Sequence, residues 1–359
     1  MRIGIDTQSI IEKKTGLGIY TQNLLYALKK IAPENEYVEI HSACCRDLST
    51  PKRWWWDQVS FSMQAKKARL DLVHKPCFSA PIFYRGKIVL TVHDIIPVFF
   101  KGGLSFSSQL YYARWMPYTF KKANKIIAVS ESTKRDLIRY LNIPAEQIRV
   151  IYEGGSFENM LVGTAEADRN RVRNKYDLPE KFLLCVSTLE PKKNLPFLVK
   201  CFCLAKKRFN FSEKLVIVGK TGWDTGRFFE QIKQYDLEKE VILPGYIPDN
   251  DLLVLFKMAS VFIFPSLYEG FGLPVLDALQ LGCPVIVSNT SSMPEIVGAS
   301  GILINPKKEK EWVKAIGLMT TKKELRRRYI ELGIKQGKKF SWQKCAKETL
   351  EVYYEVVNN

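Results

Sequence analysis

Short runs of Val, Ile and Leu, separated by amphipathic helical patterns, recur along the whole chain and constrain its fold more than any other feature. Most of these runs are continuous, which is typical of strands that helices cover on both faces. Strands that alternate with helices in this way predict α/β domains with parallel, doubly wound sheets. The predicted strands are residues 3–6, 37–41, 71–74, 88–93, 125–130, 182–188, 215–220, 241–243, 261–265, 285–288 and 302–304.

Residues 153–174 interrupt this pattern with Gly154-Gly155 and a polar stretch over 166–174. We therefore predict two Rossmann-like domains, residues 1–165 and 166–340. Two such domains leave a cleft at the carboxyl ends of both sets of strands. A last amphipathic helix follows over 341–359 with Ser341 as its cap. Its apolar face is made of Trp342, Ala346, Leu350, Tyr353 and Val357.

Composition narrows the class of protein. No run of about 18 apolar residues is present, and the first residues lack the layout of a signal peptide, so we expect a cytoplasmic protein. The eight cysteines form no C-x-x-C pair, which favours reduced, buried thiols over a zinc site. The net charge is +17, yet no nucleic-acid module accompanies it. A solvated basic surface and an anionic membrane partner both remain open.

The most informative segment is residues 264–278, in which a strand ends near Pro265 and a helix begins near Pro274. Gly270 and Gly272 allow the backbone to approach a ligand, and free amides at a helix start attract a phosphate or a sugar hydroxyl. Glu269 and Asp277 could accept hydrogen bonds from hydroxyls at two places on one ligand. The alternative is a capping Glu and an Asp that favours the helix dipole.

This segment resembles the E-x7-E motif of retaining glycosyltransferases of the GT-B fold, in the large family numbered four (glycosyltransferase group 1). Within that family the chain looks most like bacterial mannosyltransferases of O-antigen and exopolysaccharide assembly. The resemblance implies that the C-terminal helix crosses back to the N-terminal domain. Further segments fit the same template in order along the chain: residues 15–20, 91–94, 128–132, 189–194, 245–249, 289–295 and 340–342.

The resemblance assigns roles to the residues of the motif. It implies that Glu269 holds hydroxyls of the donor sugar, helped by the backbone amides of Gly270, Phe271, Gly272 and Leu273. The second carboxylate would hold the ribose, and here it is Asp277 where the family usually has Glu. Because Asp is one methylene shorter, a ribose contact needs a water or a shifted helix.

The resemblance also implies that Lys193 neutralises the donor diphosphate. Many relatives carry an Arg a few residues earlier, where this chain has Ser187 and Thr188, so Lys192 or another cation is expected to compensate. Without the family, a surface lysine is the simpler interpretation of Lys193.

Three other segments receive donor-side roles from the same resemblance. Gly16 and Gly18 would precede a helix over 19–30 and present its start to the diphosphate; a plain flexible loop is the alternative. His93 would be a hydrogen-bonding group at the reaction centre, although a lone His is more often structural. Tyr246 and Ile247 would lie beside the base, unless that loop merely packs.

The expected reaction is a same-face substitution that retains the anomeric configuration and uses neither a metal nor a cofactor. In this reaction the departing diphosphate takes the acceptor proton. GDP-mannose is the leading donor by analogy, with UDP- and dTDP-sugars open. The acceptor would be a glycan or a lipid-linked glycan. Two aromatic and basic segments, 52–69 and 99–122, suit a membrane interface, unless Trp55, Val59 and Met63 form a core stripe. Competing functions are a sugar-nucleotide epimerase, a phosphorylase or a non-catalytic basic module.

Overall fold

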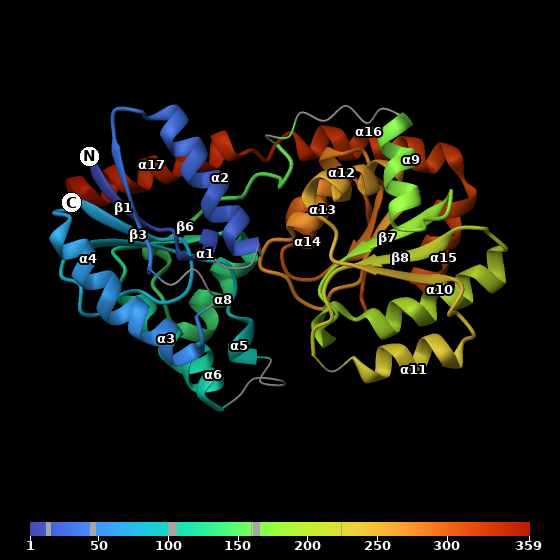
Figure 1. The fold of residues 1–359 in the computed structure, drawn as a ribbon, viewed down its shortest axis with the longest axis horizontal. Coiled ribbons are helices and arrows are strands. Elements are labelled where there is room, and N and C mark those ends of the chain that lie inside the picture. The colour runs from blue at the N-terminus through green and yellow to red at the C-terminus, as the bar shows by residue number, and fades with distance from the viewer. Residues whose placement is uncertain (12–15, 44–47, 100–105, 159, 161–165, 224) are drawn as a thin grey trace. The chain divides into compact units, whose positions relative to one another are not determined.

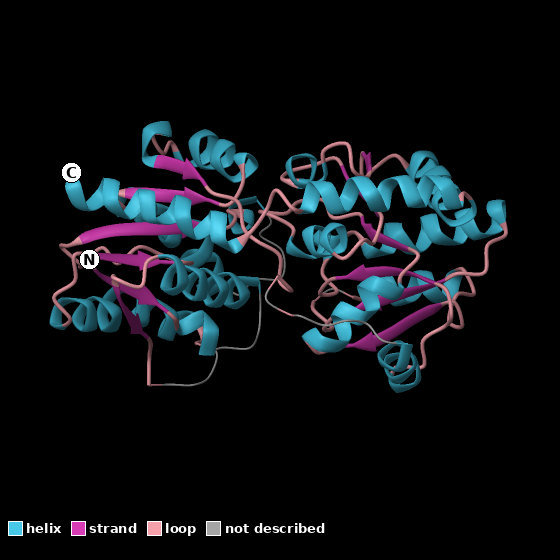
Figure 2. Cartoon of the chain, turned by 90° about the horizontal axis from the view of Figure 1, so that it is seen from above, coloured by secondary structure: helices cyan, strands magenta, loops and turns pink. Residues whose placement is uncertain are grey.

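The computed structural model describes residues 1–11, 16–43, 48–99, 106–158, 160, 166–223 and 225–359 (Figure 1). The chain forms two compact units. Unit 1 comprises Met1–Gly154 and Phe340–Asn359, and unit 2 comprises Gly155–Lys339. Each unit contains one six-stranded sheet whose described pairings are all parallel, with helices on both faces (Figure 2). The predicted doubly wound α/β class is confirmed.

The sheet of unit 1 has the order β2-β1-β3-β4-β5-β6. The chain first adds β2 on one side of β1 and then places all later strands on the other side. The carboxyl ends of β1 and β3 therefore flank the point at which the strand order reverses. The strands are β1 (Arg2–Asp6), β2 (Glu36–Ile40), β3 (Leu72–Lys75), β4 (Lys87–Val92), β5 (Lys125–Ala128) and β6 (Ile148–Val150).

Two helices that are far apart in the sequence, α2 (Gly16–Ile31) and α17 (Trp342–Asn358), lie side by side in unit 1 (Figure 1). Ser341 caps α17 by accepting a hydrogen bond from the Lys344 amide, as its sequence predicts. The other described helices of unit 1 are α1 (Gln8–Ile11), α3 (Thr50–Trp55), α4 (Phe61–Lys67), α5 (Ile96–Phe99), α6 (Phe106–Leu110), α7 (Met116–Thr119) and α8 (Glu131–Leu141), with π-helical turns at Trp56–Ser60 and Tyr111–Trp115 and 3-10 turns at Phe120–Lys122 and Ala145–Gln147.

Unit 2 repeats the doubly wound plan with the order β12-β11-β10-β7-β8-β9. Its strand order reverses between β7 and β10, which pair in parallel. The strands are β7 (Phe182–Val186), β8 (Lys214–Val218), β9 (Val241–Gly245), β10 (Val261–Phe264), β11 (Val285–Ser288) and β12 (Ile302–Ile304). The helices are α9 (Glu166–Lys175), α10 (Leu195–Phe209), α11 (Gly226–Gln234), α12 (Asp249–Met258), α13 (Leu273–Gln280), α14 (Met293–Val297), α15 (Glu309–Thr321) and α16 (Lys323–Gly337), with a 3-10 turn at Pro191–Lys193.

Three local features differ from the sequence analysis. The short strand β6 was not predicted, and α2 begins at Gly16 instead of residue 19, so both glycines lie in its first turn. The core stripe that was the alternative to a membrane interface also fails, because Trp55 and Met63 are each 57% exposed. The π-helical turn that follows Trp55 adds a residue to the local repeat and turns Trp56 and Phe61 into the core instead.

A buried charged network lies at the carboxyl ends of β1 and β3 in unit 1. Lys75 donates to Asp6 and, over 2.8 Å, to Oδ1 of Asp57. The other oxygen of Asp57 accepts from Ser79 at 2.9 Å and from Tyr111. Burial alone lowers the pKa of Lys75, but attraction to Asp57 and Asp6 outweighs it, so the pKa lies above its usual value. Lys75 is therefore a cation at neutral pH.

Two further expectations concern the state of the cysteines and the presence of a membrane-spanning helix. The described cysteines are free and buried, and Cys44 and Cys45 lie outside the described residues. Within the described part of the chain, no helix combines the length and the apolar character that a membrane span requires.

Candidate active site

Lys193 and Glu269 meet where the strand order of unit 2 reverses. Lys193 ends the 3-10 turn that follows β7, and Glu269 lies in the loop that follows β10. Since β7 and β10 are neighbours in a parallel sheet, their carboxyl ends bring both side chains together. Lys193 Nζ lies 2.6 Å from Glu269 Oε1, and the two side chains are 14% and 11% exposed. This edge of an open α/β sheet is where ligands usually bind.

Glu269 is held as a carboxylate. Burial raises its pKa, but the charges of Lys193 and Lys192 and the hydrogen bonds from Lys193 and Ser266 lower it further, so the net shift is downward. Ser266 Oγ donates to Glu269 Oε1 over 2.5 Å. The carboxylate is therefore ionised at neutral pH and directed toward Lys193.

The backbone of the same loop is fixed from the segment after β11. The Glu269 amide donates to Ser291 Oγ at 2.9 Å, and Ser292 Oγ donates to the carbonyl of Phe271 at 2.5 Å. Gly272 has φ +114°, and a Cβ there would lie 2.4 Å from the methyl of Met293. Only glycine suits this position, from which α13 starts with Leu273 and Pro274. Gly270, Phe271, Gly272 and Leu273 thus lead into a helix start, as predicted.

Asp277 lies in α13 and is buried. Its Oδ1 accepts a hydrogen bond from the backbone amide of Ser156 at 2.6 Å. A protein group therefore occupies one oxygen of the carboxylate that the sequence assigns to a ribose. Asp277 is one methylene shorter than the Glu that the family usually has at this position. The hydrogen bond from Ser156 is a further contact, and the sequence did not predict it.

Tyr246 and Ile247 follow β9 but differ in environment. Tyr246 is 50% exposed with Lys220 Nζ 5.3 Å from its ring centre, whereas Ile247 is buried. Gly245, before them, has φ +77°. Lys192 is partly buried, and its Nζ lies 3.9 Å from Glu190. These residues share with Lys193 the carboxyl edge of the β7-β8-β9 half of the sheet.

His93 belongs to unit 1, where it directly follows β4. Its Nδ1 lies 3.1 Å from Glu153 Oε1, and its Nε2 lies 3.0 Å from the carbonyl oxygen of Pro76. The Tyr20 ring stands perpendicular to the imidazole at 4.7 Å. Protein groups therefore satisfy both ring nitrogens, and substrate would have to displace one of them.

Gly16 and Gly18 also belong to unit 1, in the first turn of α2. A Cβ on Gly18 would lie 2.6 Å from the carbonyl oxygen of Ser9, so this glycine allows α1 and α2 to pack closely. Their predicted placement in a loop before the helix is wrong for the described residues. Whether they contact a diphosphate stays a prediction.

Several site partners were missed because they are remote in sequence. Glu153 lies 60 residues from His93, and Ser291 lies 22 residues from Glu269. The segments that contain Ser291 and Glu269 both fit the family template, which was the available signal. No group of three or more potential metal ligands occurs among the residues with described positions.

Known proteins resemble both units of this chain. The family described as glycosyl transferases group 1 matches residues 166–336, and glycosyltransferase family 4 matches residues 24–155. An O-antigen chain mannosyltransferase of Escherichia coli is 30% identical over 245 residues, which are 68% of this chain and 64% of that protein. A serotype-specific mannosyltransferase of Escherichia coli is 28% identical over 74% of this chain and 33% of that protein.

The matched region thus spans less than two thirds of either curated relative. Among solved structures, a sucrose-phosphate synthase of Thermosynechococcus elongatus superposes with a TM-score of 0.76 at 18% identity, over 99% of this chain and 98% of that one. The sheets, the Lys193–Glu269 pair and these matches agree, and the chain belongs to the group 1 and family 4 glycosyltransferases of the GT-B fold.

Proposed function

We propose that this chain transfers a hexose, with mannose from GDP-mannose as the leading candidate, to a lipid-linked or polysaccharide acceptor in cell-surface glycan assembly. The observation that carries the proposal is the ion pair of Lys193 and Glu269 at the strand-order reversal of unit 2, beside the start of α13. A cation, a carboxylate and helix-start amides are the groups that a diphosphate-linked sugar requires.

The division of labour follows from the chemistry of these groups. The Lys193 ammonium has three donors, so it can keep its contact with Glu269 while donating to a diphosphate. The amides that follow Phe271 bind phosphate or sugar hydroxyls, and Glu269 accepts from hydroxyls of the donor sugar. When the bond between the sugar and the diphosphate breaks, negative charge grows on the leaving group, and Lys193 with Lys192 stabilises it.

We propose retention of the anomeric configuration by same-face substitution. The acceptor hydroxyl attacks carbon 1 of the sugar from the side on which the diphosphate leaves. The departing diphosphate takes the acceptor proton, and the new glycosidic bond keeps the original configuration. The protein contributes position and electrostatic stabilisation. Proton NMR of the first product formed tests this, and an inverted anomer would contradict it.

Glu269→Gln tests the site itself. The amide keeps the size of the side chain but removes the charge that compensates Lys193. We expect the turnover rate to fall by about 100-fold or more, because hydroxyl positioning is lost. Affinity for the nucleoside diphosphate should not weaken, since Lys193 then offers an uncompensated charge. Glu309→Gln, which changes a half-buried partner of Lys200, is the matched control. Unchanged turnover in Glu269→Gln would contradict the site.

The names of the curated relatives support mannose, and a nucleotide panel tests the base. A ligand present at 100 times its Kd stabilises the folded state by about 2.7 kcal/mol. We expect GDP to raise the unfolding temperature more than UDP or dTDP. A larger effect of UDP or dTDP would replace GDP in the proposal. Isomerisation or phosphorolysis of the sugar nucleotide would instead indicate an epimerase or a phosphorylase.

Metal independence belongs to the same proposal, because basic side chains and helix amides serve the leaving group. Turnover should be unchanged after EDTA treatment and dialysis. Restoration of lost activity by Mg²⁺ or Mn²⁺ would contradict this.

We further propose that unit 1 docks on an anionic membrane at the cytoplasmic face, where a lipid-linked acceptor lies. Between Ser49 and Ser130 the acidic residues are Asp57, Asp71 and Asp94, against thirteen Lys and Arg. Helices α3 and α6 are joined by a 2.9 Å hydrogen bond between Thr50 and Ser108. The exposed residues of these helices, of α7 and of the turns that flank α7 include Trp55, Phe106, Leu110 and Tyr118 with Lys52, Arg114, Lys121 and Lys122, and we call them the aromatic-basic surface.

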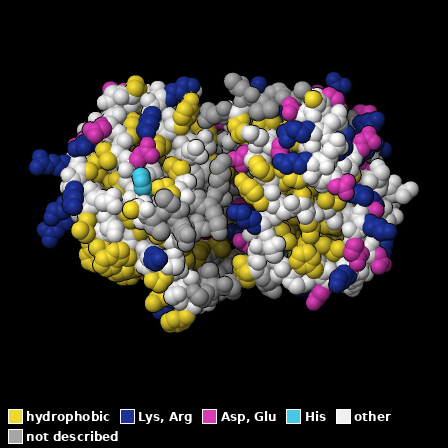
Figure 3. Space-filling view, in the orientation of Figure 1, with side chains coloured by type: hydrophobic (Ala, Val, Ile, Leu, Met, Phe, Trp, Pro, Cys, Tyr) yellow, Lys and Arg dark blue, Asp and Glu magenta, His cyan; other side chains and the backbone are white. Residues whose placement is uncertain are grey.

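The exposure and the charge of the aromatic-basic surface both favour an anionic membrane as its partner. Phe106 is 84% exposed and Tyr118 is 67% exposed. Figure 3 shows yellow side chains gathered over the region of α3, α4 and α6, with blue Lys and Arg beside them. Such mixtures bind the boundary between headgroups and acyl chains, and each basic residue adds about 1 kcal/mol near an anionic surface.

Flotation with phosphatidylglycerol vesicles at low salt tests the membrane proposal. We expect the protein to float with them and not with phosphatidylcholine vesicles. The double variant Phe106→Ser and Tyr118→Ser should lose flotation, whereas Phe229→Ser, on an exposed aromatic of unit 2, should retain it. A wild-type protein that stays at the bottom of the gradient would contradict the proposal.

A further inference from the structure

The loop between β11 and α14 contains a residue whose backbone is strained. Ser291 has φ +50°, in the left-handed region that residues other than glycine rarely adopt. In the described part of unit 2, the other non-glycine residues at positive φ are Asp177, Asn194, Asn210 and Asp236. Asparagine and aspartate tolerate this region because their short polar side chains bond to the local backbone. Serine is less suited to it, so the strain at Ser291 indicates a compensating role.

The hydroxyl of Ser291 makes a contact that offsets this strain. The backbone amide of Glu269, which lies 22 residues away in the sequence, donates to Ser291 Oγ at 2.9 Å. The direction of a side chain follows from the backbone conformation, so the left-handed φ and the direction of the hydroxyl are set together. Glycine would fit this φ without strain, but it has no hydroxyl to offer.

Neighbouring hydroxyls of the same loop hold the same stretch of main chain. Ser292 Oγ donates to the carbonyl of Phe271 at 2.5 Å and lies 3.1 Å from the carbonyl oxygen of Glu269. Thr290 Oγ1 lies 3.4 Å from the carbonyl oxygen of Ser266. The helices that follow the two loops, α13 and α14, also lie side by side (Figure 1). Three consecutive hydroxyl residues therefore fix the main chain on both sides of Glu269.

The carboxylate of Glu269 has one oxygen engaged and the other available to a ligand. Oε1 accepts from Lys193 at 2.6 Å and from Ser266 at 2.5 Å. Oε2 has no hydrogen-bond partner among the described residues. Since the main chain and Oε1 are both held, the position of Oε2 is set as well. A displacement of about 1 Å in such a site can lower a rate by about 100-fold, so this position matters for turnover.

We propose that Ser291 is a positioning residue, whose hydroxyl fixes the main chain of Glu269 so that Oε2 meets a hydroxyl of the donor sugar. This rests on the proposed function, in which Glu269 accepts hydrogen bonds from the donor sugar. The strain at Ser291 lowers stability, and its hydroxyl serves the rate. Because Ser291 acts through Glu269, its effect on the rate should vanish once Glu269 no longer binds the sugar.

Two variants separate the hydroxyl from the strain. Ser291→Gly and Ser291→Ala both remove the acceptor of the Glu269 amide, and only alanine keeps the strained φ. Hydrogen exchange of that amide in the ligand-free protein, measured by NMR, should be faster by about 10-fold in both variants, since a hydrogen bond of ordinary strength is lost. Ser291→Gly should unfold about 2 °C or more above Ser291→Ala, because glycine adopts positive φ freely.

Kinetics with GDP-mannose supply the readout that a merely structural role would not change. Both variants should lower kcat by about 10-fold or more and leave the Kd of GDP within about twofold, since GDP has no sugar for Glu269 to hold. In the Glu269→Gln background, Ser291→Gly should change the residual kcat by less than about twofold, because residues that act as a unit are not additive. Asp236→Gly is the matched control. It replaces an exposed residue of unit 2 at a similar φ of +54°, and should leave kcat and the exchange at Glu269 unchanged.

The outcomes separate the positioning role from the function on which it rests. Wild-type kcat in Ser291→Gly would overturn the positioning role, and so would an equal loss of kcat with and without Glu269→Gln. If Ser291→Ala does not fold, Ser291→Gly alone decides both points, because it carries no strain. The proposed function fails in a different way, through wild-type turnover in Glu269→Gln or through absence of transfer from GDP-, UDP- and dTDP-sugars. The positioning role then fails with it, even where exchange shows that Ser291 holds the Glu269 amide.

Discussion

Replacing Lys75 by methionine removes the cation that compensates two buried carboxylates in unit 1. The side chains of Lys75, Asp6 and Asp57 are 0–2% exposed, so solvent cannot stabilise the charges that remain. Breaking a buried ion pair by removing one partner costs about 3–5 kcal/mol. Methionine has a similar length, so little of this cost comes from a cavity.

The expected magnitude is large relative to the stability of a domain, which is about 5–15 kcal/mol. For a unit of this size each kcal/mol lowers the unfolding temperature by about 2–4 °C, so we expect a decrease of roughly 6–20 °C. Differential scanning calorimetry measures it, and Lys66→Met on α4 is the control because that lysine is exposed. The control should lie within about 0.5 kcal/mol of wild type.

The dependence on pH gives a second check with a defined sign. The pKa of Lys75 is raised in the folded state, so its contribution is fully present below the unfolded value of about 10.4 and is lost as pH rises through the folded value. Between pH 8 and 5 the wild-type contribution is therefore constant. As pH rises through the folded value, the wild-type protein should lose this contribution and the deficit of Lys75→Met should shrink. A variant within 1 kcal/mol of wild type at pH 7 would refute the reasoning.

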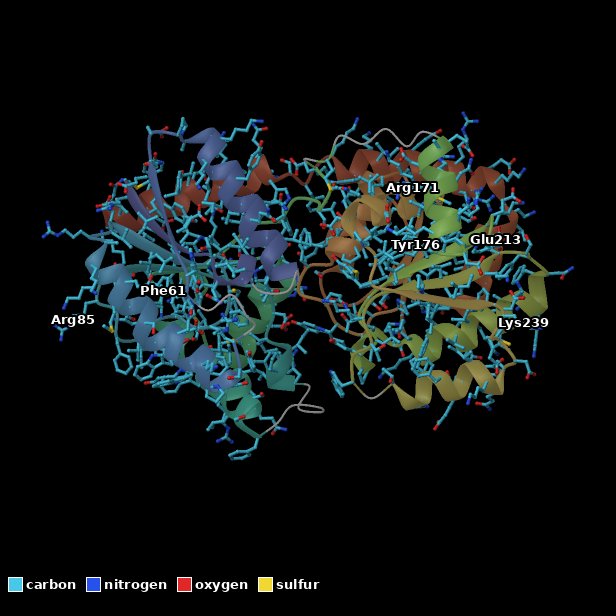
Figure 4. All side chains as sticks on the ribbon, in the orientation of Figure 1. Phe61, Arg85, Arg171, Tyr176, Glu213 and Lys239 are labelled. Atoms are coloured by element: carbon cyan, nitrogen blue, oxygen red, sulfur yellow. The ribbon has the colours of Figure 1, made fainter. Side chains whose placement is uncertain are left out.

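Three further predictions concern single positions. Tyr353→Phe removes the hydroxyl that lies 2.6 Å from Nδ1 of the buried His74, and should cost about 1–3 kcal/mol in urea unfolding. Gly272→Ala adds a Cβ at φ +114° and should weaken nucleotide binding and lower stability by about 1–3 kcal/mol; unchanged binding in calorimetry would contradict the fixed loop. Asp251, in the first turn of α12, has its pKa lowered to about 2, because hydrogen bonds from α9 and its neighbouring Tyr176 outweigh burial (Figure 4). Its contribution is present above pH 4 and is lost as pH falls through the folded value of about 2, so Asp251→Asn should cost about 1 kcal/mol at pH 7 and progressively less as pH approaches 2.

The strands could be predicted where burial on both faces leaves a continuous apolar run. β6 escaped because Ile148–Val150 is three residues long, lies at the sheet edge and contains the exposed Arg149. The sequence could not predict that Trp56 is buried while Trp55 is exposed, because helical periodicity assumes 3.6 residues per turn. The π-helical turn at Trp56–Ser60 breaks that assumption, and the five-residue spacing of Trp56 and Phe61 in the core reflects it.

The candidate site likewise contains residues that the sequence could place and contacts that it could not. Glu269, Gly272 and Lys193 lie in the segments between a strand and the next helix, so local sequence places them at a sheet edge. The contact between Ser156 and Asp277 depends on how a linker folds onto a helix 121 residues away. Local patterns contain no such information, so partners of this kind require coordinates.

Each of the two sheets has charged residues at the point where its strand order reverses. The two sets of charged residues differ in their exposure to solvent, and this difference separates their roles. In unit 1 the Lys75 network is closed to solvent and its members satisfy one another, so a ligand finds no free donor there without breaking a costly ion pair. In unit 2 Lys193 and Glu269 remain partly open and lie beside the start of α13. A diphosphate can approach that pair without first unfolding anything. This difference, more than the motif alone, argues for binding of the donor by unit 2 and for a structural role of the buried network in unit 1.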